Sequence, residues 1–590
     1  MKHYLIPPDK IPRMCESLRE RGEFAFDIET ADNGHPNGGL DPHRGELRLL
    51  QFAKTPDVAY IVDTRTLDRP SMAHITTLLE DPSVEKIIHN GKFDCKWAMK
   101  HLGADVRNVF DTFIVSRLLS RGDKTDRHGL GYVVERYLGR QVDKSEQRSD
   151  WGASELTEKQ LEYAARDVCV LPDLKEEMVT QLEHHKLMGV AKLENDIVPA
   201  MAALELNGFY LNPSRWRQQT TAAAKKHAKL TNELQDMFYA GSRQTGLFGR
   251  VEIDLGSWQQ VSVALKSLGV PMDGNSTNAE ALEEFTGKFP VVDKLFEWRE
   301  YNTQITRYGN NVLDLINPVT GRIHADFMQI EAPSGRMGCG KPNLQNIPSS
   351  DEYRTCFTAP RGKRLVVADY SQIELRVLAE YSRDKAMVKS FCSGADYHAA
   401  TAAQVFGVEM DEVTPDQRSF AKRVNFGISY GAGPGRVAKL TGKTIEETEE
   451  LLAMFFAALP DMDKYLRKAA WTTLRSRQSR TMSGRIGRWA HLDPEEHKHS
   501  LKNLGKNFPI QGTAADIFKR GLFLIHEALR GTSAKMVNLV HDEYVLECDT
   551  KDADRVAETV TKLAVQAGEE YIKLVPVVVD TKIVKEWSKE

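Results

Sequence analysis

A short apolar run, residues 365–368, ends in a carboxylate at Asp369, and Gln372 and Glu374 follow within five residues. The run predicts a buried strand. A carboxylate on a rigid strand end suits a hard divalent cation, which prefers oxygen ligands. An aspartate at such a position is also typical of a helix cap or a turn. The stretch therefore indicates metal chemistry only if other carboxylates join Asp369.

A second acidic stretch supplies those carboxylates. Apolar residues on both sides of His541, Asp542 and Glu543 predict a β-hairpin with adjacent carboxylates at its tip. One aspartate from each of two neighbouring strands could hold two cations about 4 Å apart, the arrangement used for in-line displacement at phosphorus. Asp369, Asp542 and Glu543 are therefore candidate metal ligands.

A third stretch places Arg418, Lys422, Phe426 and Tyr430 four residues apart. On a helix this spacing puts two cations and two aromatic rings along one face. Such a face suits a nucleoside triphosphate, with its phosphates against the cations and its base against the rings. A solvated cationic turn that runs into a core stripe is the alternative interpretation.

A separate acidic set occurs near the N-terminus. Asp27 and Glu29 are two residues apart on a predicted strand from Phe24 to Thr30, so both carboxylates point to one face. Asp94 follows a second strand, and Tyr163 and Asp167 are four apart on a long helical pattern from Leu156 to Thr180. Like charges side by side repel, and a cation between them relieves the repulsion. Singly, each of these signals is also typical of an ordinary surface.

Composition narrows the class of protein. With 590 residues, 41% apolar and 27% charged, the chain predicts a soluble protein of several domains. Its net charge of −4 does not by itself indicate nucleic acid. A run from Lys464 to Arg488 holds eight basic residues and no acid, which favours phosphate contact over a merely solvated helix face.

Cysteine usage and the N-terminus indicate a cellular setting. Seven cysteines without a Cys-x-x-Cys pair predict reduced, mostly buried thiols. Neither a signal sequence, a transit pattern nor a membrane-spanning stretch is visible. We therefore expect a cytoplasmic protein of a bacterial or phage-infected cell that does not bind membranes; an organelle is the alternative if a precursor was trimmed.

Together the three C-terminal stretches resemble motifs A, B and C of the family A DNA polymerases, the DNA polymerase I type. Asp-Tyr-Ser-Gln-Ile-Glu-Leu-Arg, Arg-x3-Lys-x3-Phe-Gly-x2-Tyr-Gly and Val-His-Asp-Glu stand complete and in the family's order. Ser334-Gly-Arg336, the segment 342–348 and Gln511-Gly-Thr-Ala-Ala-Asp516 are similar to further family signatures. The resemblance covers most of residues 195–590.

Residues 1–185 resemble the DEDD proofreading exonucleases of the tyrosine subtype. The resemblance implies a ribonuclease H-like fold in which four carboxylates, Asp27, Glu29, Asp94 and Asp167, hold metal ions and Tyr163 orients the attacking water. The alternation of strands and helices agrees with such a mixed α/β sheet. The chain begins almost at this domain, so we expect the separate 5′ nuclease domain of the bacterial enzymes to be missing, as in phage and some organellar relatives.

The resemblance implies a multidomain α/β and α+β fold: a 3′–5′ exonuclease followed by a right hand of palm, fingers and thumb. The expected segments are the exonuclease (1–185), thumb and start of palm (186–330), palm with motif A (331–384), fingers with motif B (385–499) and palm with motif C (500–590). A helical stretch over 213–237 would belong to the thumb, with Ser257 capping a helix at its tip.

Site roles also follow from the resemblance. Asp369 and Asp542, with Glu543 beside them, would bind two Mg²⁺, or Mn²⁺, and Lys422 would donate a proton to pyrophosphate. The implied nucleotide-binding residues are Arg418, Lys422, Phe426, Tyr430, Glu374, His398 and Gln372; a buried structural role is the alternative for His398. The implied DNA-binding residues are Arg336, Asn343, Gln345, Asn346, Asn507, Gln511, His541 and Ser257. Asn503 stands where the family usually has Arg, and Lys502 or Lys506 could compensate.

We therefore predict a template-directed DNA polymerase with 3′–5′ proofreading that acts in replication or repair. Its partners would be primer-template DNA and dNTPs, and we expect a monomer; no processivity factor or helicase can be named. The rivals are a single-subunit RNA polymerase, against which Glu374 argues because it would block a 2′-hydroxyl, a non-catalytic DNA-binding subunit, and a stand-alone exonuclease. Intact carboxylates argue against the second, and some 400 unexplained residues against the third.

Overall fold

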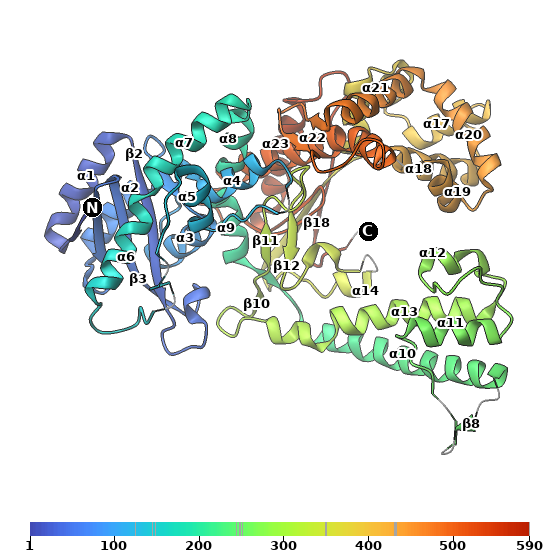
Figure 1. The fold of residues 1–590 in the computed structure, drawn as a ribbon, viewed down its shortest axis with the longest axis horizontal. Coiled ribbons are helices and arrows are strands. Elements are labelled where there is room, and N and C mark those ends of the chain that lie inside the picture. The colour runs from blue at the N-terminus through green and yellow to red at the C-terminus, as the bar shows by residue number, and fades with distance from the viewer. Residues whose placement is uncertain are drawn as a thin grey trace. The chain divides into compact units, whose positions relative to one another are not determined.

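A computed structural model describes residues 1–590 except 124, 144, 148, 243–244, 247–248, 251, 349–350, 430–432 and 589–590; the side chains of 241–251, 351, 426, 429 and 440 are also left out. The chain forms two compact units (Figure 1). The first contains Met1–Gly208, His324–Gln345 and Pro360–Lys585. The second contains Phe209–Ile323, Asn346–Ala359 and Glu586–Glu590. Each unit therefore combines residues from more than one of the linear segments expected from the sequence.

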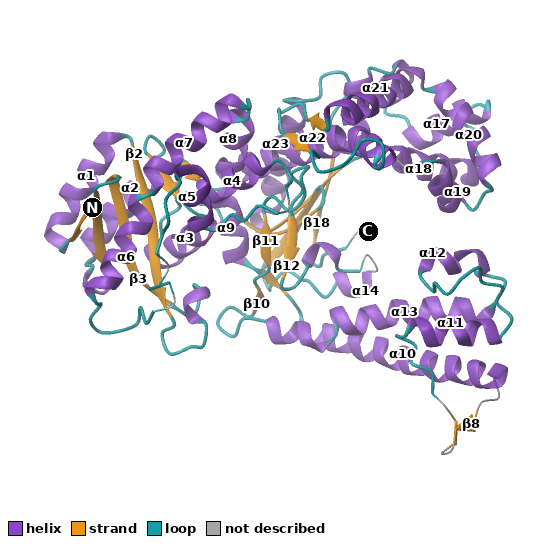
Figure 2. Cartoon of the chain, viewed as in Figure 1, coloured by secondary structure: helices purple, strands orange, loops and turns teal. Residues whose placement is uncertain are grey.

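The N-terminal part of the first unit is built on a mixed six-stranded sheet in the order β1-β4-β3-β2-β5-β6. Figure 2 shows strands of this sheet in orange, with β2 and β3 labelled. Its strands are β1 (Lys2–Leu5), β2 (Glu23–Ala31), β3 (Glu46–Thr55), β4 (Val58–Asp63), β5 (Glu85–Ile88) and β6 (Val109–Asp111). β3 is antiparallel to β2 and β4, whereas β5 and β6 run parallel to β2. This is the mixed sheet that the sequence predicted.

Helices surround that sheet and lead out of it. They are α1 (Ile11–Arg21), α2 (Arg69–Glu80), α3 (Lys92–Trp97), α4 (Thr112–Ser120), α5 (Leu130–Leu138), α6 (Glu158–Cys169), α7 (Leu171–His184), α8 (Met188–Asp196) and α9 (Val198–Asn207). α6 packs across β2, β3 and β4. That packing presents one face of α6 to the acidic strand β2.

The single helix predicted over residues 156–180 is wrong, because the structure has two helices that meet at Val170. α6 ends at Cys169, and α7 begins at Leu171 with a proline in its first turn. Pro172 has no amide hydrogen to donate and crowds the preceding turn, so it starts a helix more readily than it continues one. Tyr163 and Asp167 still share α6, as predicted.

A four-stranded antiparallel sheet in the order β16-β17-β13-β18 forms the centre of the C-terminal half. Its strands are β13 (Lys363–Tyr370), β16 (Lys535–Val540), β17 (Glu543–Asp549) and β18 (Val579–Val584). Residues 365–368 are at most 5% exposed, which confirms the predicted buried strand. α23 (Ala553–Glu569) packs on β13 and β18, and α22 (Lys498–Ala528) packs on α23.

The remainder of the first unit is mainly helical. It contains α15 (Ile373–Ser382), α16 (Lys385–Cys392), α17 (Tyr397–Phe406), α18 (Pro415–Ser429), α19 (Pro434–Thr441), α20 (Ile445–Ala458) and α21 (Pro460–Ser476). Two short hairpins complete it: β11 (Asp326–Met328) with β12 (Gly338–Gly340), and β14 (Gln478–Arg480) with β15 (Ile486–Arg488). α18 carries the predicted nucleotide-facing stripe up to Ser429.

The second unit has its own core, made by α10 (Pro213–Ser242), α11 (Trp258–Ser267), α12 (Ala279–Leu282) and α13 (Pro290–Tyr308). The helix predicted over 213–237 is confirmed. So is the cap at Ser257, whose hydroxyl accepts the Gln260 amide at 3.5 Å. All seven cysteines are free and six are buried, Cys392 being the exposed one. In the described residues, no helix combines the length and apolar character that a membrane crossing requires.

Candidate active sites

The N-terminal acidic set gathers from three elements of the first unit. Asp27 and Glu29 lie on one face of β2, Asp94 lies on α3, and Asp167 follows Tyr163 by one turn on α6. Asp94 and Tyr163 are only 2% and 6% exposed. The alternation of β2 and the packing of α6 across it place these side chains together, as the sequence predicted.

Burial, and then mutual repulsion, disfavour the charged forms of these carboxyl groups. Burial raises the pKa of Asp27 to about 8, and the charge of Asp167 adds to the effect. Burial and the neighbouring carboxylates also hold the pKa values of Glu29 and Asp94 well above their ordinary values. The pKa of the Tyr163 hydroxyl is raised by burial and then by Asp167, so this group stays protonated.

The donor set fits a hard divalent cation. Asp94 Oδ1 is buried and has no hydrogen-bond partner among the described residues. Only oxygen ligands are offered, which suits Mg²⁺ or Mn²⁺. Within the described ranges, no three His, Cys, Asp or Glu side chains already converge as ligands around one point. The carboxylates are thus close enough to repel one another without forming a closed cage.

The C-terminal acidic set meets at the tip of the β16–β17 hairpin. Asp369 on β13 stands in register with Glu543 on β17, and the Tyr370 amide donates to the Asp542 carbonyl at 3.2 Å. Burial raises the pKa of Asp542 to about 7, with further contributions from Asp369 and Glu374. The structure therefore confirms the predicted juxtaposition of Asp369 and Asp542.

Two residues beside these carboxylates adopt left-handed backbone conformations. Gln372 has φ +55° and His541 has φ +54°, and neither is a glycine. Such residues are uncommon and occur where the surrounding structure enforces them, often at functional sites. At Gln372 the turn ends β13 and starts α15, which carries Glu374.

A cleft of about 320 Å³ opens beside Asp542. Its lining includes residues that the sequence assigned to the polymerase site: Arg336, Gln345, Gln372, Glu374, Gln511, His541 and Asp542. Lys519 also lines it, a residue that the sequence reasoning missed. The available signal was its position on the same helix as Gln511 and Asp516, three residues beyond the Gln511–Asp516 motif.

Inside this cleft Arg336 forms an ion pair with Glu374, whose side chain is 11% exposed. The sequence assigned Arg336 to DNA and Glu374 to the nucleotide, and it did not predict that the two side chains form a pair. Tyr430 lies outside the described residues, as does the side chain of Phe426. Both partners of the ion pair line the same cleft as Asp542.

Of the two predicted phosphate-binding cations on α18, Arg418 has a carboxylate partner in the structure. Arg418 Nε donates to Asp396 at 2.6 Å, and Lys422 is exposed. His398 is 3% exposed, and its Nδ1 accepts Asn425 Nδ2 at 3.1 Å. Burial lowers the pKa of His398 to about 4, and Arg418 and Lys422 lower it further while Asp396 opposes them. A neutral, buried His398 agrees with the second interpretation given in the sequence analysis, a buried structural role.

The other predicted DNA contacts are spread over both units. Gln345 Nε2 donates to the Leu539 carbonyl at 3.3 Å, and Asn343 Oδ1 accepts the Gln345 amide at 3.0 Å. Asn507 lies one turn before Gln511 on α22. The remaining two, Asn346 and Ser257, belong to the second unit.

Near Asn503 the Lys502 ammonium lies 4.3 Å from the Trp471 ring centroid. Burial and then Lys502 lower the pKa of Lys506. Lys502 therefore has an aromatic partner within the protein, whereas Lys506 is a partly buried cation in the same turn of α22.

The basic run 464–488 is not uniformly a phosphate-facing surface. Arg485 is 1% exposed and pairs with Asp516 at 2.6 Å and with Glu194. For Arg485 the predicted phosphate contact is therefore wrong, because its charge is neutralised inside the protein. The absence of acidic residues near Arg485 in the sequence did not reveal this pairing, because Glu194 lies 291 residues away in the chain.

Comparison with known proteins finds a separate family match for each of the two parts of the chain. The family model for DNA polymerase family A matches residues 217–589, and that for the 3′–5′ exonuclease matches residues 7–183. DNA polymerase I of Aquifex aeolicus is 32% identical over 578 residues, which span 92% of this chain and 94% of that protein. DNA polymerase I of Pseudomonas aeruginosa is 30% identical, over 97% of this chain but 64% of the longer relative.

A solved structure has the same fold. It is described as the POL domain of Pol1 from M. smegmatis in complex with DNA primer-template and dNTP, and it superposes with a TM-score of 0.83 at 23% identity over 99% of both chains. The fold class predicted from the sequence is thus confirmed. On these matches the chain belongs to DNA polymerase family A, and it carries a 3′–5′ exonuclease domain ahead of the polymerase part.

Proposed function

We propose that this chain extends primers on a DNA template with dNTPs and removes mispaired 3′ ends with its exonuclease domain. The observation that carries the proposal is the meeting of Asp369 and Asp542 beside a cleft that also holds Arg336, Glu374 and Gln511. A second, chemically similar acidic set stands on a different sheet. Two acidic sites on one chain fit synthesis at one and hydrolysis at the other.

At the polymerase site, Asp369 and Asp542 would hold two Mg²⁺, with Glu543 in register beside them. When bound, such cations lower the pKa of the attacking hydroxyl and stabilise the charge on the transferred phosphoryl group. Arg418 and Lys422 would bind the triphosphate, and the Lys422 ammonium would give a proton to the departing pyrophosphate. Arg418 must exchange Asp396 for phosphate when the nucleotide binds.

At the base and sugar, Phe426 and Tyr430 would pack on the nascent pair, and Glu374 and Gln372 would face the sugar. Arg336, Gln345, Asn507, Gln511 and His541 would contact the primer-template, together with Asn343, Asn346 and Ser257. Gln345, Gln511 and His541 line the same cleft as Asp542, which supports their assignment to the primer end.

At the exonuclease site, Asp27, Glu29, Asp94 and Asp167 would hold the cations. The Tyr163 hydroxyl lies beside Asp167 and stays protonated, so it can orient the attacking water by a hydrogen bond. The four exonuclease carboxylates and Asp542 are half-buried or buried, whereas Asp369 is exposed at the end of β13.

Primer extension tests the proposal. A labelled primer on a template should lengthen with dNTPs and Mg²⁺, should not lengthen with rNTPs, and should shorten when nucleotides are absent. Efficient extension with rNTPs would favour an RNA polymerase. Shortening without extension would favour a stand-alone exonuclease, and DNA binding without either reaction would favour an accessory subunit.

We expect Glu374→Ala to increase ribonucleotide insertion relative to deoxynucleotide insertion. A 2′-hydroxyl would clash with Glu374 and disturb its ion pair with Arg336. Breaking a buried polar pair costs about 1–3 kcal/mol, so discrimination should fall by about fivefold or more, mainly in kcat/KM for rNTPs. Single-nucleotide insertion kinetics measure the ratio.

Phe426→Tyr is the matched control for that experiment. An added hydroxyl should relax discrimination against dideoxynucleotides without admitting ribonucleotides. An unchanged rNTP-to-dNTP ratio in Glu374→Ala would show that Glu374 does not exclude the 2′-hydroxyl.

Removing divalent metal should make stability fall as the pH rises. Asp27 keeps its proton up to a pKa of about 8 in the folded chain, against 3.8 ordinarily. Between about pH 4 and about pH 8 the unfolded chain therefore releases a proton that the folded chain retains, which destabilises the fold progressively. With Mg²⁺ present, the cation should neutralise the carboxylates and flatten this dependence.

Thermal melting in EDTA and in Mg²⁺ across this pH range measures the effect. Asp27→Asn combined with Glu29→Gln should lose most of the difference between the two conditions. An equal difference in that variant would assign the metal effect to another site.

A further inference from the structure

The segment between the two family matches contains two deeply buried glutamates. The matches end at residue 183 and resume at residue 217, and helices α8 and α9 occupy most of the interval. Glu194 on α8 is 0% exposed and Glu205 on α9 is 4% exposed. A buried carboxylate is tolerated when cations and hydrogen bonds neutralise it, and each of these glutamates accepts from two cationic side chains.

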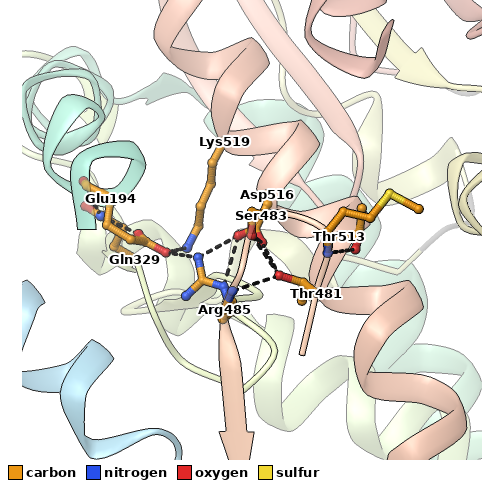
Figure 3. A network of polar contacts seen from close by, with 9 residues as sticks. Glu194, Gln329, Thr481, Ser483, Arg485, Thr513, Asp516 and Lys519 are labelled. Carbon is orange, nitrogen blue, oxygen red and sulfur yellow. Dashed lines mark hydrogen bonds and ion pairs between the residues drawn. The ribbon is translucent and has the colours of Figure 1, made fainter. Parts of the chain in front are cut away.

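Glu194 is the centre of a network that joins α8 to the β14–β15 hairpin and to α22 (Figure 3). Its Oε1 accepts Arg485 Nη2 and, at 2.6 Å, Lys519 Nζ; its Oε2 accepts Gln329 Nε2 at 2.7 Å. Arg485 donates to Asp516 Oδ1 from Nε at 3.0 Å and from Nη2 at 2.6 Å. Two cations and two carboxylates, all at most 1% exposed, thus balance one another.

This network reaches the polymerase cleft by two routes. Lys519 lines the cleft together with Asp542. The Arg485 guanidinium lies directly against Gly335: a Cβ at Gly335, where φ is +86°, would stand 2.6 Å from Arg485 Cζ. The next residue is Arg336, which pairs with Glu374 in the cleft. Because Arg485 is held on both sides, the turn that presents Arg336 rests on a fixed surface.

Glu205 makes the corresponding contacts with the exonuclease part. Its Oε1 accepts Lys92 Nζ and its Oε2 accepts Lys96 Nζ, each at 2.6 Å. Both lysines lie on α3, and Asp94 lies between them on that six-residue helix. The helical stretch continues beyond Trp97 as the π-helix Ala98–Leu102, so the two lysines attach its first six residues to Glu205. The Phe327 amide donates to Glu205 Oε1 at 2.7 Å and anchors the carboxylate from the other side.

We propose that the connector helices α8 and α9 position both active sites. Glu194 acts through Arg485 and the 334–336 turn on Arg336 in the polymerase cleft, and Glu205 acts through Lys92 and Lys96 on Asp94 in the exonuclease site. Both are positioning residues that touch neither substrate. The assignment rests on the proposed function for what the two sites do.

The test uses Glu194→Gln and Glu205→Gln in the full chain, with single-nucleotide insertion and 3′ degradation of single-stranded DNA measured on each. Misplacing a reacting group by about 1 Å can cost about 100-fold. We expect Glu194→Gln to lower kcat for insertion between about 10-fold and about 100-fold while degradation changes less than about twofold. Glu205→Gln should give the reverse pattern. Each variant is the other's control, since both remove one buried negative charge that faces two cations.

A double-variant cycle separates positioning from loss of stability. If Glu194 acts through Arg336, Glu194→Gln should have little further effect on insertion in an Arg336→Ala background. If instead the losses of insertion caused by the two substitutions multiply in the double variant, Glu194 does not act through Arg336. If Glu194→Gln does not fold, Gln329→Leu removes a neutral donor to the same carboxylate, and Lys96→Met serves likewise for Glu205. Each should give a smaller loss confined to the same activity.

The outcomes distinguish the inference from the function beneath it. An unaltered chain with neither activity would overturn the proposed function. Both activities in the unaltered chain, with each variant lowering both equally or neither, would overturn the positioning role and leave the proposed function intact.

Discussion

Asp542→Asn should lower kcat for nucleotide insertion by about 10³-fold or more while primer-template affinity stays nearly unchanged. The loss corresponds to several kcal/mol of transition-state charge stabilisation. Asp542 lies at the hairpin tip beside Asp369 of β13, and burial and then the charge of Asp369 raise the pKa of Asp542. DNA affinity rests on many phosphate contacts, so removing one carboxylate should leave it in place. Single-turnover insertion kinetics and a binding titration measure the two quantities.

Asp549→Asn is the matched control for that experiment. Asp549 ends β17 on the same hairpin, where its carboxylate pairs with Lys363 at a distance of 2.8 Å. It is not among the residues that line the cleft. This variant should insert nucleotides at the parental rate. Parental insertion by Asp542→Asn itself would show that the reactive carboxylates lie elsewhere.

Asp27→Ala combined with Glu29→Ala should abolish 3′ degradation, by about 10³-fold or more, and leave extension largely intact. The two side chains belong to β2, whereas Asp369 and Asp542 belong to a different sheet. The variant should also melt at a higher temperature in EDTA, because it lacks two half-buried carboxyl groups whose charged forms are disfavoured by burial and by mutual repulsion. Degradation of a labelled single strand and thermal melting are the measurements.

Asp57→Ala provides the control, since Asp57 is an exposed turn residue between β3 and β4 of the same sheet. It should change neither activity. Loss of extension in a folded Asp27→Ala, Glu29→Ala protein would contradict two independent sites.

Much of the two sites could be predicted because their signals are local. The buried run before Asp369 and the hairpin around Asp542 are each encoded within about a dozen residues. The period of a strand placed Asp27 and Glu29 on one face, and the period of a helix placed Tyr163 above Asp167. Even so, the break between α6 and α7 was missed although its signal, Pro172, is also local.

The remainder depends on contacts between residues far apart in the chain. Arg336 and Glu374 are 38 residues apart, and Glu205 is 113 residues from Lys92. Nothing in the pattern around any of these residues names its partner. The edge strand β18 was not foreseen either, because it alternates buried and exposed residues weakly and carries charged side chains at two of its exposed positions, Asp580 and Lys582. Tertiary packing alone decides these features.

Template-dependent conversion of dNTP to dNMP tests most directly whether synthesis and removal occupy separate sites on this chain. A protein with both activities repeatedly inserts and excises the next correct nucleotide, so dNMP should accumulate steadily in the presence of primer-template and Mg²⁺. Neither Asp542→Asn nor Asp27→Ala, Glu29→Ala should support the conversion. Accumulation of dNMP without primer-template, or its persistence in either variant, would contradict the account.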